Sequence, residues 1–212
     1  MQRIVPGTWS CIFLQQKVPG TWSCIVGIDL SIKRKSGICV VDKYFKFINP
    51  KFQLGLTVRF NELVRFLSEE RDIQLVVIDA PLTYPDKNFR DAEIELRKEG
   101  IRALPLNFLS DMENLIQEIL KVYKGEIIET FPDGVFKFLN LKGGRKLRSD
   151  REVLFKELKR FIKFPLEFST TNRDFIDACL CVICGIFYVK GETKKFGGKE
   201  GTIYLPTIKS FL

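Results

Sequence analysis

Runs of apolar residues predict the strands of a buried sheet. Three of them, Cys24–Leu30, Leu75–Ile78 and Glu126–Phe131, lack the alternation of a half-exposed strand, which indicates strands covered on both faces. Gly37–Val41 and Tyr44–Ile48 follow the first run after short polar turns. We therefore expect the first three strands to form an antiparallel meander, with two further strands later in the chain.

The segments between these strands have apolar residues at helical spacing. Apolar residues in Arg59–Glu70 fall on one helical face. Ser110 and Ser149 each precede a glutamate by three residues, the spacing of a capping box that begins a helix. A last helix, capped by Asn172 or Thr171, is apolar nearly all round, so we expect it to lie deep in the core.

The order of these elements predicts one α/β domain over residues 18–212. We expect a ribonuclease H-like, mixed five-stranded sheet with helices on both faces. Two segments interrupt it: a helical insertion at about 83–106, which carries a short charged helix at Arg90–Lys98, and a helical segment at about 132–165. Residues 1–17 form an N-terminal extension, because VPGTWSCI occurs at Val5–Ile12 and again at Val18–Ile25, and only the second copy leads into a strand.

The composition limits the binding partners and catalytic mechanisms that the chain can have. The 212 residues include 34 Lys and Arg against 26 Asp and Glu, a formal charge of +8. This surplus favours a polyanionic partner, nucleic acid before an anionic membrane surface, although a Lys-rich soluble surface would give the same balance. The absence of histidine excludes Ser-His-Asp catalysis and most zinc sites.

The patterns of apolar residues and cysteines indicate the cellular compartment of the protein. We expect a soluble cytoplasmic protein without a membrane segment, because the longest apolar run, Phe175–Val189, is short and contains Asp177. The N-terminus does not have the pattern of a secretory signal. Cys179, Cys181 and Cys184 lie inside the apolar run and are typical of buried free thiols in a reducing environment.

Carboxylates stand where three predicted strands end. Asp29, Asp79 and Glu129 close the apolar runs, and the functional crevice of an open α/β sheet lies beyond the carboxyl ends of its strands. Asp174 and Asp177 are three residues apart and share one face of the last helix. Each could instead cap a loop or complement a helix dipole. Their repetition favours an oxygen-rich site for Mg²⁺ or Mn²⁺.

A resemblance then appears along residues 24–206. The chain resembles a family of predicted nucleases with a ribonuclease H fold, catalogued as a domain of unknown function, and its DxxDA helix is distantly similar to that of Holliday-junction resolvases. The motifs that carry the likeness are GIDLS at Gly27–Ser31, VIDAPL at Val77–Leu82, RDAE at Arg90–Glu93, IETFP at Ile128–Pro132, DFIDA at Asp174–Ala178 and GTIYLP at Gly201–Pro206.

The resemblance implies roles for the acids. Asp29 would be the central bridging ligand, Asp79 or Glu129 would hold a second metal, and Asp177, with Asp174 as a further candidate, would close the site. Resolvases usually have a glutamate where Asp79 stands and lack the IETFP acid, which puts those two positions in question. The implied reaction is two-metal hydrolysis of a phosphodiester, in which no histidine base is needed.

A basic, glycine-containing loop supplies candidate phosphate ligands. KGGRKLRSDR lacks the spacing of a nucleotide-binding P-loop, so we expect it to contact a nucleic-acid backbone instead. The residues expected to bind substrate are Arg90, Lys142, Arg145, Lys146 and Arg148.

Two other functions stay open from the sequence. One is a non-catalytic nucleic-acid-binding or adaptor protein that has kept the fold. The other is a phosphotransferase of the sugar-kinase and actin-like type, a class that pairs two such domains around ATP and is longer than this chain.

Overall fold

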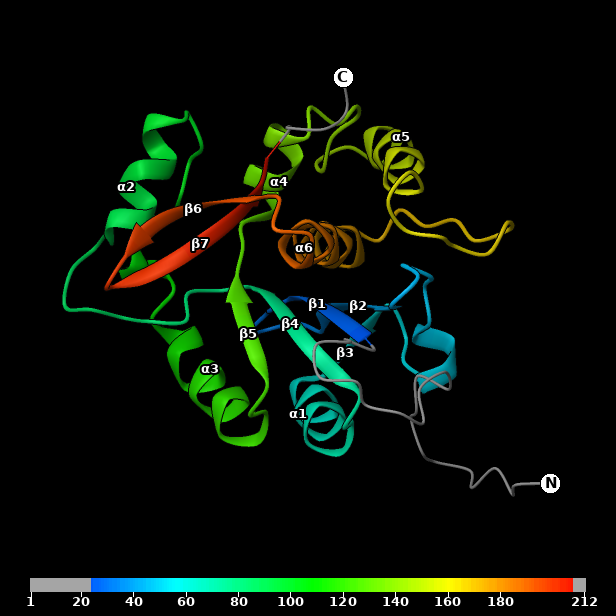
Figure 1. Cartoon of the computed structure of the whole chain (residues 1–212), viewed down its shortest axis with the longest axis horizontal. Helices are drawn as coiled ribbons and strands as arrows, with labels where there is room; N and C mark the ends of the chain where they lie inside the picture. Colours follow the sequence, from blue (N-terminus) through cyan, green and yellow to red (C-terminus); the bar gives the residue numbers. More distant parts are fainter. Residues whose placement is uncertain (1–23, 208–212) are drawn as a thin grey trace.

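A seven-stranded mixed sheet organises the molecule (Figure 1). The computed structural model describes residues 24–207. Its strands are β1 (Cys24–Asp29), β2 (Ser36–Asp42), β3 (Thr57–Val58), β4 (Ile73–Asp79), β5 (Glu126–Glu129), β6 (Thr193–Gly198) and β7 (Gly201–Pro206). Its helices are α1 (Phe60–Glu69), α2 (Asp91–Lys98), α3 (Asp111–Val122), α4 (Pro132–Phe138), α5 (Arg148–Leu158) and α6 (Arg173–Val189), with short 3₁₀ helices η1 (Asn49–Phe52) and η2 (Leu106–Phe108).

The strand order is β3-β2-β1-β4-β5-β7-β6. β1 pairs antiparallel with β2 and parallel with β4, and β5 and β7 continue the parallel part. The fold is therefore mixed α/β as predicted, but its sheet has seven strands and not five. Two of the additional strands form a hairpin beside β5: the Lys-rich β6 pairs antiparallel with β7, and Phe196 of β6 is buried. Lysines on an edge strand conceal such a strand in the sequence.

The prediction of a third meander strand at Tyr44–Ile48 is wrong. Lys46 donates its backbone N–H to the Asp42 side chain at 3.0 Å, which closes a turn, and the segment makes only isolated β-bridges. The third strand is instead Thr57–Val58, which pairs with the start of β2, whereas Phe47 forms its bridge with Val41 near the end of β2. A two-residue strand is too brief for an alternating pattern to reveal it.

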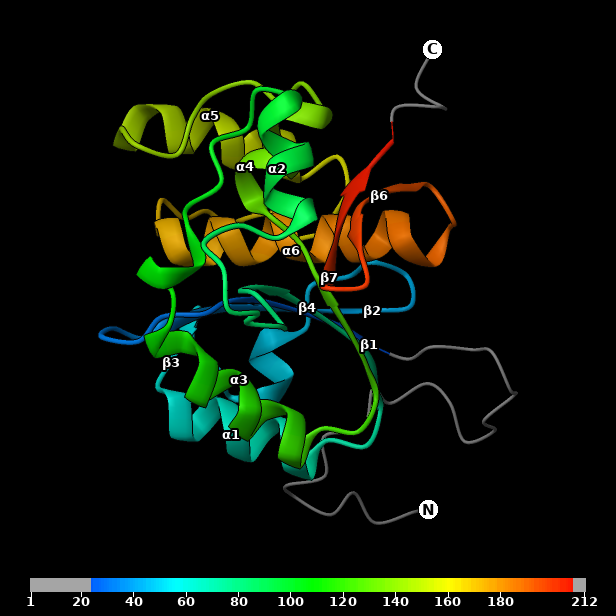
Figure 2. The ribbon, with the colours of Figure 1, turned by 90° about the vertical axis from the view of Figure 1, so that its left-hand side faces the viewer.

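Alternate residues of the central strands face two separate cores. Ile25 and Val77 point to the side covered by α6, whereas Val26 and Val76 point to the side covered by α1 and α3. Figures 1 and 2 show these layers, with α4 and α5 stacked beyond α6 and α2 lying against the β6–β7 hairpin. The helix expected to be apolar nearly all round is the central one, α6.

The caps match the predictions only in part. Asn172 caps α6 by accepting the backbone N–H of Phe175 at 2.9 Å. The predicted boxes at Ser110 and Ser149 are wrong: Ser110 already has helical dihedral angles and makes no side-chain cap, and Ser149 lies inside α5, which begins at Arg148.

The predicted segments can be placed within these limits. The insertion at 83–106 contains α2, and the segment at 132–165 contains α4 and α5. The extension 1–17 and the first VPGTWSCI copy lie outside the described residues, while the second copy ends in β1 at Cys24 and Ile25. Within 24–207, none of the helices combines the length and apolarity needed to cross a membrane.

Candidate functional site

Two glycines allow α6 to lie directly on the sheet. A Cβ on Gly27 would stand 2.2 Å from the backbone oxygen of Ala178, and one on Gly37 would stand 1.9 Å from that of Asp174. Real side chains do not tolerate such distances, so only glycine permits this approach. Gly37 is also the register partner of Asp29, which places the first turn of α6 beside the end of β1.

Asp29 and Asp79 form the base of the site. They are register partners on the parallel strands β1 and β4. Burial and the neighbouring charges of Asp177 and Asp174 raise the pKa of Asp29 to about 7. Burial raises the pKa of Asp79 as well, with contributions from Asp29 and Asp177. Burial is the larger cause of both shifts, and the like charges of the neighbouring acids add to it.

Arg145 supplies a positive charge to this acidic cluster. Its Nη1 donates to Asp177 Oδ1 at 2.8 Å, and the guanidinium also forms an ion pair with Asp133. Arg173 Nε lies 3.6 Å from Asp177 Oδ2. Burial nevertheless raises the pKa of Asp177, even though Arg145 opposes that shift. The negative charge of the cluster is therefore only partly balanced.

Glu129 has a different environment from the other predicted ligands. Arg90, which is fully buried, donates from Nη1 to Glu129 Oε2 at 2.9 Å and from Nη2 to Glu129 Oε1. Arg90 Nε also bonds to Glu93, and the backbone N–H of Leu82 reaches Glu129 Oε2 at 3.0 Å. Both Glu129 oxygens therefore already have donors. Burial raises the pKa of Glu129, and Arg90 opposes the rise.

The structure brings some predicted site residues together and not others. Asp29, Asp79, Asp174 and Asp177 converge at the carboxyl edge of the sheet, and Arg145 joins them. Arg90 was expected to bind substrate but lies buried in the ion pairs with Glu129 and Glu93, without an exposed surface. The remaining predicted phosphate ligands are exposed and distributed over the loop before α5 and its first turn: Lys142, Lys146 and Arg148.

Sequence reasoning missed three charged neighbours of the site. Arg34 Nη2 lies 3.7 Å from Asp174 Oδ1, Asp133 pairs with Arg145, and Arg173 precedes Asp177 by four residues in α6. Only the last pair has a signal in the sequence, the i,i+4 spacing of a helical ion pair.

A cavity of about 350 Å³ opens beside the two strand-end aspartates. Asp29 and Asp79 line one part of it, and Arg34 and Arg173 line it as well. Glu93, Glu129 and Thr130 line it too, and an apolar part of the wall comes from the insertion, the start of α3 and the residues after β5: Leu96, Ala103, Leu104, Leu109, Met112 and Phe131.

The carboxylate oxygens of this site are suitable ligands for a divalent cation, although the side chains are not positioned as a complete metal site. No group of three or more acidic or cysteine side chains within 24–207 is arranged as a ready metal site. Asp29 and Asp79 make no ion pair in that part of the chain, and hard carboxylate oxygens with unbalanced charge are what Mg²⁺ or Mn²⁺ binds. Asp29 and Asp79 would hold the ion, joined by Asp177 if Arg145 moved away.

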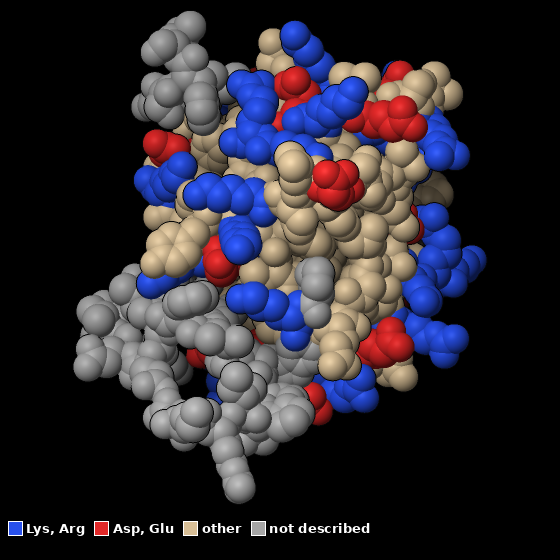
Figure 3. Space-filling view, turned by 90° about the vertical axis from the view of Figure 1, so that its right-hand side faces the viewer, with Lys and Arg blue, Asp and Glu red and all other residues tan. Residues whose placement is uncertain are grey.

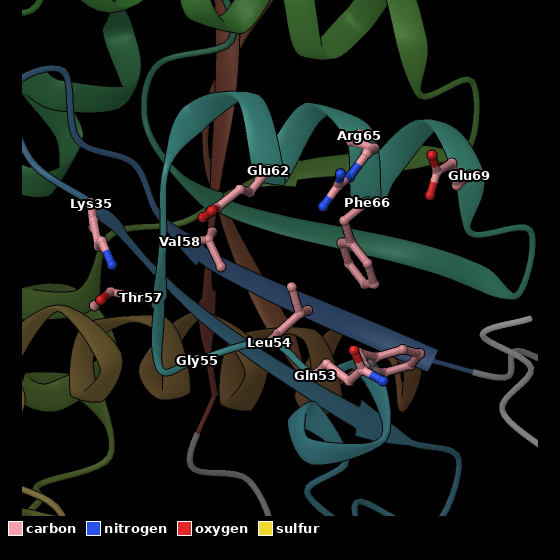
Figure 4. Close-up of a pocket in the computed structure, with 11 residues that line it drawn as sticks. Lys35, Gln53, Leu54, Gly55, Thr57, Val58, Glu62, Arg65, Phe66 and Glu69 are labelled. Carbon is pink, nitrogen blue, oxygen red and sulfur yellow. The ribbon is translucent and has the colours of Figure 1, made fainter. Parts of the chain in front are cut away.

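A second cavity, of about 420 Å³, lies between α1 and the segment that leads into β3 (Figure 4). Glu62, Arg65 and Phe66 extend toward it from α1, and Lys35 borders it from the other side. Glu62 accepts the backbone N–H of Arg59 at 2.8 Å, which fixes the start of the helix. The mixed charges here do not converge on one point, so we assign no chemistry to this cavity.

Comparisons with protein-family models, curated proteins and solved structures each gave no match to this chain.

Proposed function

We propose that this protein is a metal-dependent nuclease that hydrolyses phosphodiester bonds of nucleic acid. The observation that carries the proposal is geometric: Asp29 and Asp79 are register partners at the ends of the adjacent parallel strands β1 and β4, and Asp174 and Asp177 of α6 lie beside them. Acids held together at an electrostatic cost indicate a site adapted to a cation. The antiparallel start of the sheet followed by parallel strands is also in keeping with a ribonuclease H-like fold.

Asp29, Asp79 and Asp177 would hold Mg²⁺ or Mn²⁺. The bound ion would supply a hydroxide near neutral pH and neutralise charge on the phosphate. Asp29 and Asp79 would bind the ion as ionised carboxylates, so the affinity for the metal should rise with pH. Arg34 and Arg173, both largely exposed at the cavity, can contact the phosphate oxygens as charged donors.

The surface charge supports a nucleic-acid partner. Lys and Arg side chains predominate over acidic ones around the face on the side of α5 (Figure 3). Lys142 and Lys146 are exposed on the loop that also positions Arg145 at the acids, and Arg148 is exposed in the first turn of α5. Such cations attract the phosphate backbone regardless of sequence, and the attraction weakens with salt.

The test is cleavage of labelled DNA and RNA, single-stranded and duplex, with Mn²⁺ or with excess chelator. We expect Asp29→Asn to lower the rate by at least about 100-fold, the scale of losing a major electrostatic contribution. Asp86→Asn, an exposed aspartate outside the cavity, is the matched control and should retain wild-type activity. Cleavage that persists in chelator, or in Asp29→Asn, would rule out this mechanism.

The second candidate is nucleic-acid binding without hydrolysis. It is favoured by Arg145, whose guanidinium already balances part of the acidic cluster without an ion. This function predicts binding that is insensitive to chelator and equal in wild type and Asp29→Asn, with no product in any condition.

A further inference from the structure

The cavity beside Asp29 and Asp79 has an apolar wall that is partly exposed to water. Leu104 is 58% exposed, and Leu109 and Met112 line the same wall. Leu109 and Met112 are partly buried, and Phe108, which does not line the cavity, is 74% exposed in the same segment. Apolar side chains that line a cavity next to charged residues indicate a ligand that is apolar at one end.

The wall is held in place before any ligand arrives. Arg97 Nη2 donates to the backbone oxygen of Ala103 at 3.0 Å, and Leu106 donates its backbone N–H to Asn88 at 2.8 Å. These bonds fix residues 103–106, on either side of Leu104, to α2 and to the loop before it. A preformed wall reduces the ordering cost of binding.

The charged residues of the cavity indicate the polar part of the ligand. The acids at the base of the cavity suit a cation, and the guanidinium groups of Arg34 and Arg173 suit an anion beside it. A phosphate bound between a cation and these arginines would have its attached sugar and base directed along the apolar wall. Cationic, anionic and apolar subsites in one cavity match the parts of a nucleotide.

We propose that this cavity binds the base and sugar of one unpaired nucleotide of the substrate strand, and this inference rests on the proposed nuclease function. A base paired and stacked inside a duplex cannot enter a cavity, whereas a base in a single strand or loop can. The substrate class is therefore a nucleic acid with an unpaired nucleotide at the scissile phosphate.

The test uses the wild-type protein with Ca²⁺ in place of Mn²⁺, so that the carboxylates can still hold a cation while cleavage is suppressed. A short single strand carries 2-aminopurine, whose fluorescence rises when the base leaves its stacked neighbours, and anisotropy gives the Kd. We expect the single strand to bind more tightly than the same sequence in a blunt duplex, with a rise in fluorescence. Equal affinity for the two, without a rise, would overturn the inference.

Leu104→Ser tests the wall itself under the same conditions. Its side chain is exposed, so the fold should survive, and urea unfolding checks this. We expect about 10-fold weaker binding and loss of the fluorescence rise, because the base loses apolar contact. Leu166→Ser, at a 90% exposed leucine outside the cavity, is the control and should bind normally. If both variants bind alike, a ligand other than a base covers the wall and the inference fails.

The two proposals fail in different ways. Fluorescence that rises with wild-type protein, but without cleavage in Mn²⁺, would sink the nuclease function and leave a site for unpaired nucleotides. Cleavage that depends on Asp29 but not on Leu104 would retain the nuclease function and discard the nucleotide cavity.

Discussion

Gly37 and the backbone oxygen of Asp174 are in direct contact, so close that a Cβ on Gly37 would stand 1.9 Å from that oxygen. The contact joins the strand beside β1 to the first turn of α6. It sets how closely Asp174 and Asp177 approach Asp29, because both acids lie on α6 and Asp29 is the register partner of Gly37 on the neighbouring strand β1. The electrostatics of the site thus depend on the absence of one methyl group.

Gly37→Ala should destabilise the protein by about 1–3 kcal/mol, because the helix must shift to make room. Urea unfolding measures the loss. Gly198→Ala is the control, since a Cβ there would have nothing within 4 Å, and it should remain near wild type. The shift of α6 should also lower the pKa of Asp29 toward its ordinary value. Equal stability of the two variants would show that the contact relaxes freely.

The stability of the metal-free protein should fall as pH rises from about 4 to 7. Asp29 holds its proton more tightly in the folded chain, where its pKa is about 7, than in the unfolded chain, where it is near 3.8. The folded state therefore binds more protons across that window, and the free energy of unfolding decreases with pH. Burial and neighbouring charges shift Asp79 in the same direction.

Mn²⁺ should reverse this loss, by about 2.7 kcal/mol at 100 times its Kd. Thermal melts across the pH series, with and without Mn²⁺, check both effects. In Asp29→Asn the pH slope should shrink and the response to Mn²⁺ should largely disappear. Identical responses of wild type and variant at every pH would contradict a metal site at Asp29.

Arg145→Gln should distinguish the stabilisation that the Arg145 guanidinium gives to the acidic cluster from the stabilisation that Mn²⁺ gives to it. Asp177 would lose a 2.8 Å charged hydrogen bond while remaining buried, at a cost of about 3 kcal/mol at pH 8. The cost should be smaller at acidic pH, where Asp177 takes up a proton. Mn²⁺ should stabilise this variant more than it stabilises wild type, because the ion no longer competes with the guanidinium.

Arg148→Gln provides the comparison for Arg145. Arg148 is exposed and lies 3.7 Å from Glu152, a surface pair whose loss should change stability by less than about 0.5 kcal/mol. Equal effects of the two substitutions would mean that Arg145 is a surface residue in solution. An unchanged response to Mn²⁺ in Arg145→Gln would mean that the ion does not use Asp177.

Glu129→Gln should damage the fold and leave the metal response intact. Arg90 would keep Glu93 but lose its second carboxylate in a fully buried position, which costs about 3 kcal/mol. Asp79→Asn should behave oppositely, with stability at neutral pH retained and the Mn²⁺ response lost. Denaturant unfolding with and without Mn²⁺ distinguishes the two, and a metal response lost only in Glu129→Gln would restore Glu129 as a ligand.

The central strands and their terminal acids were predictable because buried parallel strands leave long apolar runs. Asp29 and Asp79 close two of those runs and meet at one edge of the sheet. The edge strands were not predictable in the same way: Thr57–Val58 is too short to show a period, and Thr193–Gly198 resembles a charged loop. Side chains of edge strands pack against fewer neighbours than those of central strands, so packing constrains their sequences less.

The pairing of charges was the least predictable part of the site. Arg90 and Glu129 are 39 residues apart and meet only through the fold. Arg145 was expected to face a phosphate, and its loop turns it toward Asp177 instead. Local patterns identify which residues carry charge, whereas the partner of each charge depends on how distant segments pack.

The buried position of Arg90 has a consequence for how the molecule opens. Its guanidinium joins the first turn of α2 to the end of β5, and neither carboxylate can leave without stranding a charge away from water. The insertion and β5 should therefore unfold as one cooperative unit. In native-state hydrogen exchange, amides of α2 and β5 should share a single opening free energy, and Glu129→Gln should lower it for both segments together.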